Sequence, residues 1–262
     1  TYNYGHWPSP ITPELLTAQG VRISDPQAIG NCLYWLETRP QEKGRNVLVR
    51  ECGGSRNDVF AAPTSVRTRA QEYGGSSYLA TDNFIFFIEN NDQRIYQYAT
   101  ADGAITGITG ETNSRYADFC YDITRHRLLA VCEDYSRPGH HPYSSIIAID
   151  LRECAVTTLA SGADFYSNPR ISPDGKSLSY LRWFHPQMPW DGTECVVASL
   201  DENGIVVQEK IIAGSATESI FQPQWAPTGE LFFVSDRNNW WNIYRFNQGV
   251  IESVLPMDAE FA

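Results

Sequence analysis

The stretch Pro169-Arg-Ile-Ser-Pro-Asp-Gly175 and the apolar run Leu178-Ser-Tyr-Leu-Arg182 that follows it decide the fold, because both recur along the chain. Pro-Asp-Gly is a tight-turn sequence, since proline presets φ and glycine accepts a positive φ. The turn aligns with Pro223-Gln-Trp-Ala-Pro-Thr-Gly229, which precedes the run Leu231-Phe-Phe-Val-Ser235. Three more copies of the apolar run, each closed by a polar residue, are Leu33-Tyr-Trp-Leu-Glu37, Ile85-Phe-Phe-Ile-Glu89 and Leu129-Ala-Val-Cys-Glu133.

The five copies start 52, 44, 49 and 53 residues apart, and a second apolar element follows each at a similar distance. These second elements are Asn46–Arg50, Arg94–Tyr98, Ser145–Ile149, Glu194–Ala198 and Asn242–Phe246. Units of about 40–50 residues with several short strands are typical of propeller blades. A β-sandwich would show less even spacing, and no βαβ alternation supports a parallel sheet. We therefore predict an all-β fold, a β-propeller of four-stranded antiparallel blades with about five blade units.

The predicted blades occupy residues 23–262, and residues 1–22 form an N-terminal segment. Thr12–Gln19 is the one helix candidate, with Thr12 as N-cap, Pro13 at the first helical position and Gly20 as the stop. A propeller must bury its outermost blades against each other. The last unit ends close to Ala262 with no strand left over for the first blade, so we expect a piece of a longer propeller.

The net charge, the apolar stretches and the cysteines restrict the partners and the location that we expect for this chain. The net charge of −11 repels phosphate backbones, so we expect no nucleic-acid partner. No apolar stretch approaches the roughly 20 residues that span a bilayer, and no signal peptide is visible, so we expect a soluble protein without a membrane partner. The six cysteines form no C-x-x-C pair and several lie in apolar runs. We expect buried free thiols rather than a disulfide framework, and hence a reducing, cytoplasmic location.

Catalytic motifs are missing from the sequence. It contains no G-x-S-x-G elbow, H-E-x-x-H motif, P-loop or clustered Cys/His ligand set, so we expect no catalytic residue, metal or cofactor in this chain. His140 and His141 are interpreted as surface residues. The pairs Asp92 with Arg94 and Asp236 with Arg237 occupy the same loop position in two blades, and we interpret them as blade-stabilising pairs rather than ligands.

The loop from Trp183 to Glu194 carries three aromatic and two acidic residues. Such an apolar loop at a blade edge fits contact with another domain or a peptide, and it fits local packing equally well. Within it, His185-Pro-Gln-Met-Pro-Trp-Asp-Gly-Thr-Glu194 resembles a signature of the propeller domains of the prolyl oligopeptidase family. The resemblance is strongest to the acylaminoacyl-peptidase and dipeptidyl-aminopeptidase-like branch. It extends along the chain through Gly5–Thr12, Val66–Arg69, Glu72–Gly75, Tyr166–Gly175, Glu218–Trp225, Ser235–Arg237 and Trp240–Trp241.

This resemblance implies an N-terminal propeller, usually seven-bladed, that caps a C-terminal α/β-hydrolase domain with a Ser-Asp-His triad. The chain would then be the substrate-gating propeller of a serine peptidase that hydrolyses short peptides. Its partners would be the peptide substrate and its own C-terminal hydrolase domain, and it would not perform acyl transfer alone. Gln71 and Ser76 depart from the family pattern, which more often has His and Gly at these positions.

Residues expected to contact substrate or the hydrolase domain are Glu72, Tyr73, Trp190, Asp191 and Glu194. A carboxylate of Glu72 or Glu194 could accept a charge-assisted hydrogen bond from the α-amino group of a peptide. Two other functions remain open. One is a stand-alone propeller that binds a protein or peptide partner. The other is a metal-dependent lactonase-like propeller, which would require acidic and amide side chains around a central cation.

Overall fold

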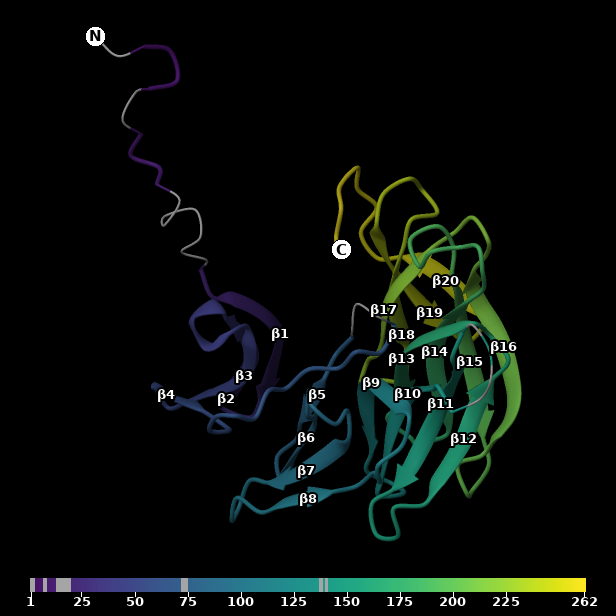
Figure 1. The fold of residues 1–262 in the computed structure, drawn as a ribbon. Coiled ribbons are helices and arrows are strands. Elements are labelled where there is room, and N and C mark those ends of the chain that lie inside the picture. Colours follow the sequence, from purple (N-terminus) through teal and green to yellow (C-terminus); the bar gives the residue numbers. More distant parts are fainter. Residues whose placement is uncertain (1–2, 7–8, 13–19, 72–74, 137–138, 140) are drawn as a thin grey trace. The chain divides into compact units, whose positions relative to one another are not determined.

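The chain folds into five four-stranded antiparallel sheets, the blades of a β-propeller (Figure 1). The computed structural model describes residues 3–6, 9–12, 20–71, 75–136, 139 and 141–262. Each sheet is a meander whose four strands are neighbours in sequence order. The predicted fold class is therefore confirmed, and in the described residues the only helix is the 3₁₀ turn η1 (Pro40–Glu42). Of the predicted helix Thr12–Gln19, residues 13–19 lie outside the described residues.

The strands follow the repeat. Blade 1 consists of β1 (Arg22–Ile29), β2 (Cys32–Arg39), β3 (Arg45–Cys52) and β4 (Ser55–Asp58). Blade 2 consists of β5 (Tyr78–Ala80), β6 (Phe84–Ile88), β7 (Ile95–Ala99) and β8 (Ile105–Gly107). Blade 3 consists of β9 (Ser114–Asp122), β10 (Arg127–Asp134), β11 (Tyr143–Asp150) and β12 (Val156–Ser161). Blade 4 consists of β13 (Phe165–Ile171), β14 (Ser177–Trp183), β15 (Glu194–Leu200) and β16 (Val206–Gly214). Blade 5 consists of β17 (Ile220–Trp225), β18 (Leu231–Ser235), β19 (Asn242–Asn247) and β20 (Val250–Ser253).

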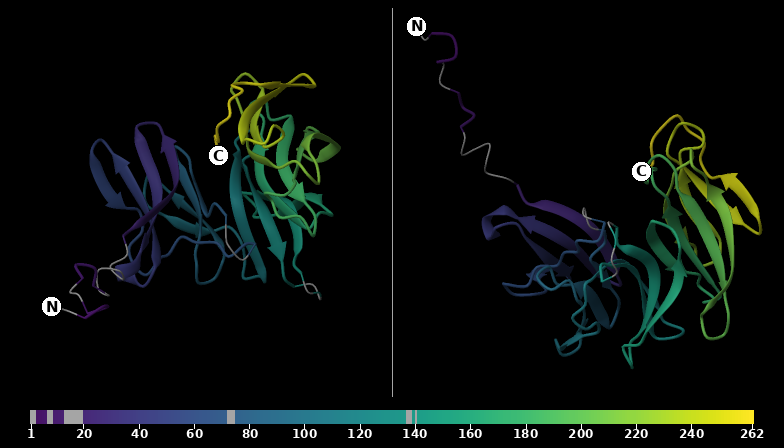
Figure 2. Two further views of the ribbon diagram at one scale, coloured as in Figure 1. Left: turned by 90° about the horizontal axis from the view of Figure 1, so that it is seen from above. Right: turned by 45° about the vertical axis from the view of Figure 1, so that its right-hand side comes forward.

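Two compact units divide the chain, residues 1–66 and residues 67–262. The first unit contains blade 1, whose buried cluster is Trp35, Val47 and Val49. The second unit contains blades 2 to 5, and Figure 2 shows their sheets from two further sides. In this second unit the first strands β5, β9, β13 and β17 are neighbours in that order. The division into a segment 1–22 and blades 23–262 stays a prediction, although β1 begins at Arg22.

In blade 3, the second strand β10 is buried on both faces because it packs between blades 2 and 4. In β10, Leu128 joins a cluster with Phe86 and Ile95 of blade 2. The adjacent Leu129 joins another cluster with Tyr180 of blade 4. Successive side chains of a strand point to opposite faces, so an unbroken apolar run supplies both interfaces. This arrangement explains why the runs show no alternation of apolar and polar residues.

A β-bulge interrupts the first strand of several blades, and in blade 3 it links three blades. The pairing of β9 with β10 shifts between Leu129 and Val131, and Asp118 has a left-handed φ of 55°. The Asp118 carboxylate accepts a hydrogen bond from the backbone N–H of Ser76 at 2.9 Å, and another from that of Asn168 at 3.3 Å. Equivalent register shifts with left-handed residues occur at Asp25, Asn168 and Gln222.

The structure corrects one expectation about the cysteines. Cys32 and Cys52 form a disulfide, so the expectation of free thiols is wrong for these two residues. Cys120, Cys132, Cys154 and Cys195 are free, and Cys132 and Cys195 are buried as expected. The two paired residues lie 20 positions apart and meet because β2 and β3 pair in a register that sets them opposite each other.

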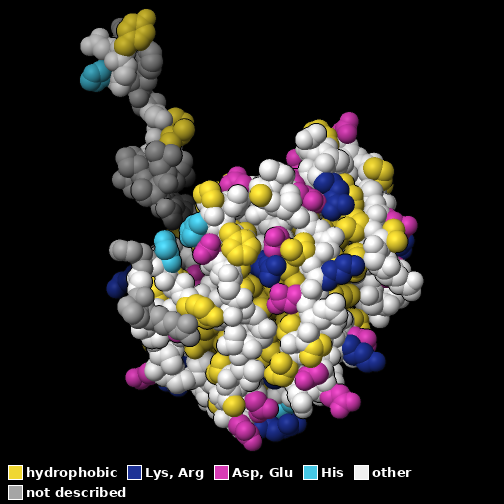
Figure 3. All heavy atoms as spheres, turned by 90° about the vertical axis from the view of Figure 1, so that its right-hand side faces the viewer, with side chains coloured by type: hydrophobic (Ala, Val, Ile, Leu, Met, Phe, Trp, Pro, Cys, Tyr) yellow, Lys and Arg dark blue, Asp and Glu magenta, His cyan; other side chains and the backbone are white. Residues whose placement is uncertain are grey.

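The surface is mixed in charge. On the side of the molecule drawn in Figure 3, acidic and basic side chains alternate among hydrophobic ones rather than gathering in one block. In the described part of the chain, no helix is long and apolar enough to cross a membrane.

Candidate functional site

Three of the five predicted site residues lie in or beside one connection, the loop 184–193 between β14 and β15. Because each blade is an antiparallel meander, this connection lies at the same end of the strands as the start of the first strand. We call this side the entry edge. The loop contains Trp190 and Asp191, and Glu194 is the first residue of β15. Glu72 and Tyr73 lie outside the described residues, so the predictions for them stay untested.

Asp191 shapes the loop. Its Oδ2 accepts the backbone N–H of Met188 at 2.9 Å, while its own N–H donates to the Met188 carbonyl at 2.9 Å. Side-chain bonds of this kind from Asp to nearby backbone groups stabilise turns. Asp191 therefore has a clear local role, and the prediction that it contacts a substrate or domain stays untested.

Blade 5 holds the other end of the loop. The Thr193 hydroxyl donates to the Ile220 carbonyl at 3.1 Å and accepts the Ile220 N–H at 2.7 Å. Ser219 donates from its hydroxyl to the Pro189 carbonyl. A Cβ on Gly192 would lie 2.4 Å from the Ser215 carbonyl oxygen, so only glycine fits this approach. The Asp-Gly-Thr part of the motif thus fastens the loop of blade 4 to the first strand of blade 5.

Fastening the loop leaves its apolar side chains exposed. Trp190 is 60% exposed, and Met188 and Phe184 are 40% and 39% exposed. Trp240, in the equivalent loop of blade 5, is 36% exposed. Large exposed aromatic side chains on a secured loop are typical of contact surfaces. The loop therefore combines both interpretations of the sequence, because it packs locally through its polar residues and presents Trp190 to solvent.

Glu194 belongs to a charged network across β14, β15 and β16. Its Oε2 accepts from Arg182 Nε at 2.7 Å, and Arg182 Nη1 also donates to Glu209 at 3.2 Å. Glu209 in turn accepts the hydroxyl of Tyr180 at 2.6 Å. Burial, and next the bond to Glu209, raise the pKa of Tyr180 well above its usual range, so this phenol stays protonated. The Glu194 carboxylate is thus held in place by a cation from its own blade.

A second element of the entry edge, the segment 67–71, was only partly expected from the sequence. Thr68 donates from its hydroxyl to the Tyr116 carbonyl of blade 3. The Gln71 backbone N–H donates to Glu133 Oε2 at 2.8 Å, and its side-chain amide donates to the Tyr166 carbonyl of blade 4 at 2.8 Å. The segment therefore runs over blades 3 and 4 and ends directly before Glu72.

Sequence reasoning did not identify Glu133 as part of this arrangement. It is 2% exposed and also accepts the Tyr135 hydroxyl at 3.1 Å. The sequence contained a sign of this role, because Glu133 ends its apolar run as Glu37 and Glu89 end theirs. Its partner Gln71 is also a residue at which this sequence departs from the family pattern.

The two predicted ion pairs are wrong in their partners. Asp92 accepts the backbone N–H of Arg94 at 3.0 Å and the Tyr96 hydroxyl at 2.6 Å, whereas the Arg94 guanidinium donates to the Thr109 carbonyl. Because Asp92 and Arg94 are two residues apart, the aspartate closes a turn instead of pairing across strands.

In blade 5, Asp236 accepts the Ser219 N–H at 2.8 Å. Arg237 pairs with Glu218 at 2.7 Å and stacks over Tyr244. All of these contacts lie within or between blades, so the residues stabilise the fold through partners other than those predicted.

His141 contacts the loop rather than standing alone. Its ring lies 5.0 Å from that of His185, which packs edge-on against Phe165. His140 lies outside the described residues. Within the described ranges, no group of three or more His, Cys, Asp or Glu side chains could hold a metal ion.

Known structures resemble this chain in sequence and in fold. No family model matches the chain, and no curated protein matches it. Among solved structures, the puromycin-hydrolysing peptidase of Mycobacterium tuberculosis is 34% identical over 100% of this chain, with a TM-score of 0.88. A puromycin hydrolase is 30% identical over 100% of the chain, with a TM-score of 0.90. TolB from Acinetobacter baumannii, at 15% identity and a TM-score of 0.58, shares the fold alone.

The chain spans 43% of the length of each of the two puromycin-hydrolysing enzymes. A prolyl endopeptidase structure matches at 10% identity with a TM-score of 0.63, which again shows only the fold. The likeness at 30–34% identity covers every residue of this chain, including the loop 184–193 and the segment 67–71 described above. The structures that match at 30–34% identity over the whole chain are propeller domains of puromycin-hydrolysing peptidases of the prolyl oligopeptidase family, and this chain has the fold of that domain.

Proposed function

We propose that this chain is the substrate-gating propeller of a serine peptidase that hydrolyses short peptides. The observation that carries the proposal is its similarity, over its whole length, to puromycin-hydrolysing peptidases in which it accounts for 43% of the chain. The remaining length of those enzymes is sufficient for a separate hydrolase domain. Puromycin carries an amino acid with a free α-amino group, so the substrate class we propose is short peptides and amides with a free amino end.

In this proposal the chemistry is nucleophilic acyl transfer in the hydrolase domain, where serine attacks, histidine shuttles the proton and aspartate orients the histidine. The propeller supplies none of these three groups. Its contribution is exclusion and positioning, because a rigid cap admits short chains and keeps folded proteins from the nucleophile. The entry edge is suited to this task, since the hydrogen bonds of Thr193 and Ser219 fix the loop 184–193.

Trp190 is the contact residue that we place at the edge of the gate. Its side chain is 60% exposed on a loop that Asp191 closes into a turn and Thr193 ties to blade 5, so its surface is available without rearrangement. A preorganised aromatic side chain loses little conformational entropy on binding. Asp191 positions it, by closing the turn to Met188.

Glu194 and Glu72 are the two carboxylates that we propose for the α-amino group of the substrate. Arg182 occupies Oε2 of Glu194, so a substrate ammonium would bind at Oε1. The same arginine keeps the carboxylate oriented, and a carboxylate forms a charge-assisted hydrogen bond with an ammonium group. Glu72 follows Gln71, whose two hydrogen bonds to Glu133 and Tyr166 fix the chain at that point.

The first experiment compares this chain with the product of the gene read past the codon for Ala262. Both are assayed on puromycin and on a dipeptide anilide, each with a free or an acetylated amino end. We expect hydrolysis by the longer product only, and a preference for the free amine. Hydrolysis by the 262-residue chain itself, or a stop codon directly after Ala262, would overturn the proposal and favour a stand-alone binding propeller.

The second experiment tests the carboxylates in the active, longer protein. Glu194→Gln and Glu72→Gln are each expected to raise KM for the free-amine substrate at least tenfold and to leave KM for the acetylated substrate unchanged. Glu252→Gln is the matched control, because Glu252 lies in β20 and pairs with Arg245 on the exposed strands of blade 5. Equal effects on the two substrates would show that neither carboxylate binds the amino group.

A further inference from the structure

The disulfide belongs to blade 1 in the first compact unit, whereas the candidate site belongs to the second unit. Cys32 is the first residue of β2 and Cys52 is the last residue of β3, and the two are direct register partners with their Cα atoms 4.4 Å apart. Both side chains are partly exposed at this end of the sheet. Reagents in solution can therefore reach the sulfur atoms without unfolding of the blade.

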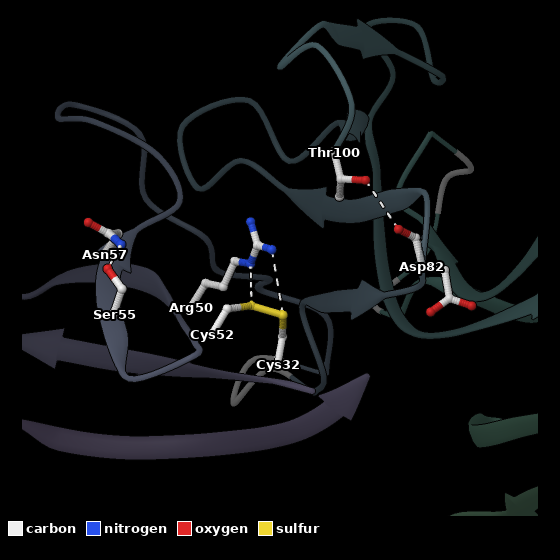
Figure 4. The surroundings of a disulfide bond; sticks show 7 residues. All are labelled: Cys32, Arg50, Cys52, Ser55, Asn57, Asp82 and Thr100. Carbon is white, nitrogen blue, oxygen red and sulfur yellow. Dashed lines mark hydrogen bonds between the residues drawn. A yellow bond between two sulfur atoms is a disulfide. The ribbon is translucent and has the colours of Figure 1, made fainter. Parts of the chain in front are cut away.

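Arg50 directs its guanidinium at both sulfur atoms (Figure 4). Its Nε donates to Cys52 Sγ at 2.9 Å and its Nη2 donates to Cys32 Sγ at 3.5 Å. Arg50 and Cys52 are two residues apart in β3, so their side chains share one face of the sheet. The guanidinium also lies 5.9 Å from the centre of the Tyr34 ring, which supports this orientation.

The other charged contacts of blade 1 do not involve Arg50. Arg39, Arg45 and Arg56 pair with Glu37, Glu42 and Asp58. In the described part of the unit, no carboxylate forms an ion pair with Arg50. Its positive charge is therefore directed at sulfur rather than neutralised by an acid.

Three of the remaining cysteines, Cys120, Cys132 and Cys195, differ from this pair because burial is the largest influence on their thiols. Burial raises the pKa of Cys132 to about 12 and that of Cys195 to about 12, and it also raises the pKa of Cys120. These thiols are held protonated and are therefore poor nucleophiles. Cys154 is free and exposed, so its alkylation provides a comparison within the same molecule.

We propose that Cys32 and Cys52 form a reversible thiol–disulfide exchange site in which Arg50 stabilises the thiolate of Cys52. The co-reactant is a low-molecular-weight or protein dithiol. Its first thiolate attacks Cys32 Sγ, the bond between the two protein sulfurs breaks, and the electron pair goes to Cys52 Sγ beside Arg50 Nε. The second thiol of the reductant, after losing its proton, attacks the mixed disulfide at its own first sulfur and releases Cys32.

The balance of the step is two electrons and two protons, with the protein disulfide reduced to two thiols and the dithiol oxidised to its disulfide. Cys52 is assigned as the leaving group because Arg50 Nε is closer to it, at 2.9 Å, than Nη2 is to Cys32, at 3.5 Å. A leaving thiol of lower pKa departs faster. This inference does not depend on the proposed peptidase activity, since every group in it belongs to blade 1.

The first test maps the thiols of the purified chain by alkylation and peptide mass spectrometry, before and after titration with dithiothreitol under native conditions. We expect Cys154 to be alkylated at once, and Cys32 and Cys52 to become reactive together at a reductant concentration that leaves the chain folded by circular dichroism. Cys32 and Cys52 that are already alkylated without reductant, or that resist reduction until the chain unfolds, would overturn the proposal.

The second test measures the role of Arg50 through the pH dependence of alkylation by iodoacetamide in Cys32→Ser, where Cys52 cannot pair. We expect the midpoint for Cys52 to lie at least one pH unit below that for Cys154 in the same molecule, as a cationic neighbour lowers a thiol pKa. Adding Arg50→Gln should remove the difference. Arg22→Gln, which removes an exposed charge of β1, should not. Reduced wild-type chain provides the same comparison if Cys32→Ser does not fold, and coincident midpoints for Cys52 and Cys154 would refute the role of Arg50.

Discussion

Removal of the Asp118 carboxylate should weaken the second unit more than its single position suggests, because this side chain connects first strands of three blades. It accepts the Ser76 N–H at 2.9 Å and the Asn168 N–H at 3.3 Å, and its own N–H donates to the Ser76 carbonyl at 2.9 Å. A hydrogen bond to an ionised acceptor contributes about 1.5–3 kcal/mol, and a longer one contributes less. Counting about 2 kcal/mol for the shorter bond and about 1 kcal/mol for the longer one gives a loss of about 3 kcal/mol for Asp118→Ala.

The backbone adds a further cost. Asp118 has a φ of 55°, and alanine tolerates this left-handed conformation less well than aspartate, by about 1 kcal/mol. The expected total for Asp118→Ala is therefore about 4 kcal/mol. Asp118→Asn keeps the left-handed tolerance and one acceptor oxygen, so its expected cost is about 2 kcal/mol.

Equilibrium unfolding in urea, followed by tryptophan fluorescence and by circular dichroism, measures these differences. Asp102→Asn is the control, since Asp102 accepts only a local N–H from Ala104 at 3.0 Å in an exposed turn, and it should cost less than 1 kcal/mol. A cost below 1 kcal/mol for Asp118→Ala, or equal costs for Asp118→Asn and Asp102→Asn, would refute the bridging role.

Three other substitutions test features of the loops and of blade 1. Gly192→Ala forces a Cβ to within 2.4 Å of a backbone oxygen and should cost about 2 kcal/mol or more in urea unfolding, whereas Gly229→Ala, with open space but a φ of 90°, should cost about 1 kcal/mol. The bond from Arg39 holds the pKa of Asp58 below its usual range, so its stabilisation is complete above a pH of about 4 and is lost as the pH falls through the lower folded pKa. Asp58→Asn should therefore flatten the acid limb of thermal stability, and an unchanged limb would contradict this cause. Replacing both disulfide cysteines by serine opens a loop of 20 residues and should cost about 3 kcal/mol, read as a lower melting temperature of the non-reduced chain.

The repeat in the sequence identified the fold because each apolar run marks the second strand of a blade. Leu33, Ile85, Leu129, Leu178 and Leu231, the first residues of the five runs, all lie in such strands. The burial of both strand faces follows from unbroken apolar runs alone. The bulge at Asp118 could not be predicted, since a left-handed φ at a residue other than glycine has no mark in the sequence.

The sequence indicated which residues belong to the candidate site but not which atoms they bind. Trp190 stood out as an aromatic residue in an apolar loop, and it is exposed as a contact residue requires. The partners of Asp92 and Asp236 were wrong, because each depends on which backbone N–H a turn brings within reach. The disulfide was missed for a similar reason, since the spacing of Cys32 and Cys52 has no meaning until the register of β2 and β3 is known.

The division of β10 between two clusters has a consequence for how the second unit comes apart. Leu128 contributes to the joint with blade 2, and its immediate neighbour Leu129 contributes to the joint with blade 4. Two consecutive residues thus belong to two different interfaces in a linear array of blades, in which coupling runs only between nearest neighbours. Replacing one of these leucines by alanine should weaken the interface on its own side and leave the opposite interface intact. Backbone hydrogen exchange would then increase only in the blades on either side of the weakened interface. A propeller of this kind could be made to open at one blade boundary by changing a single methyl-bearing side chain.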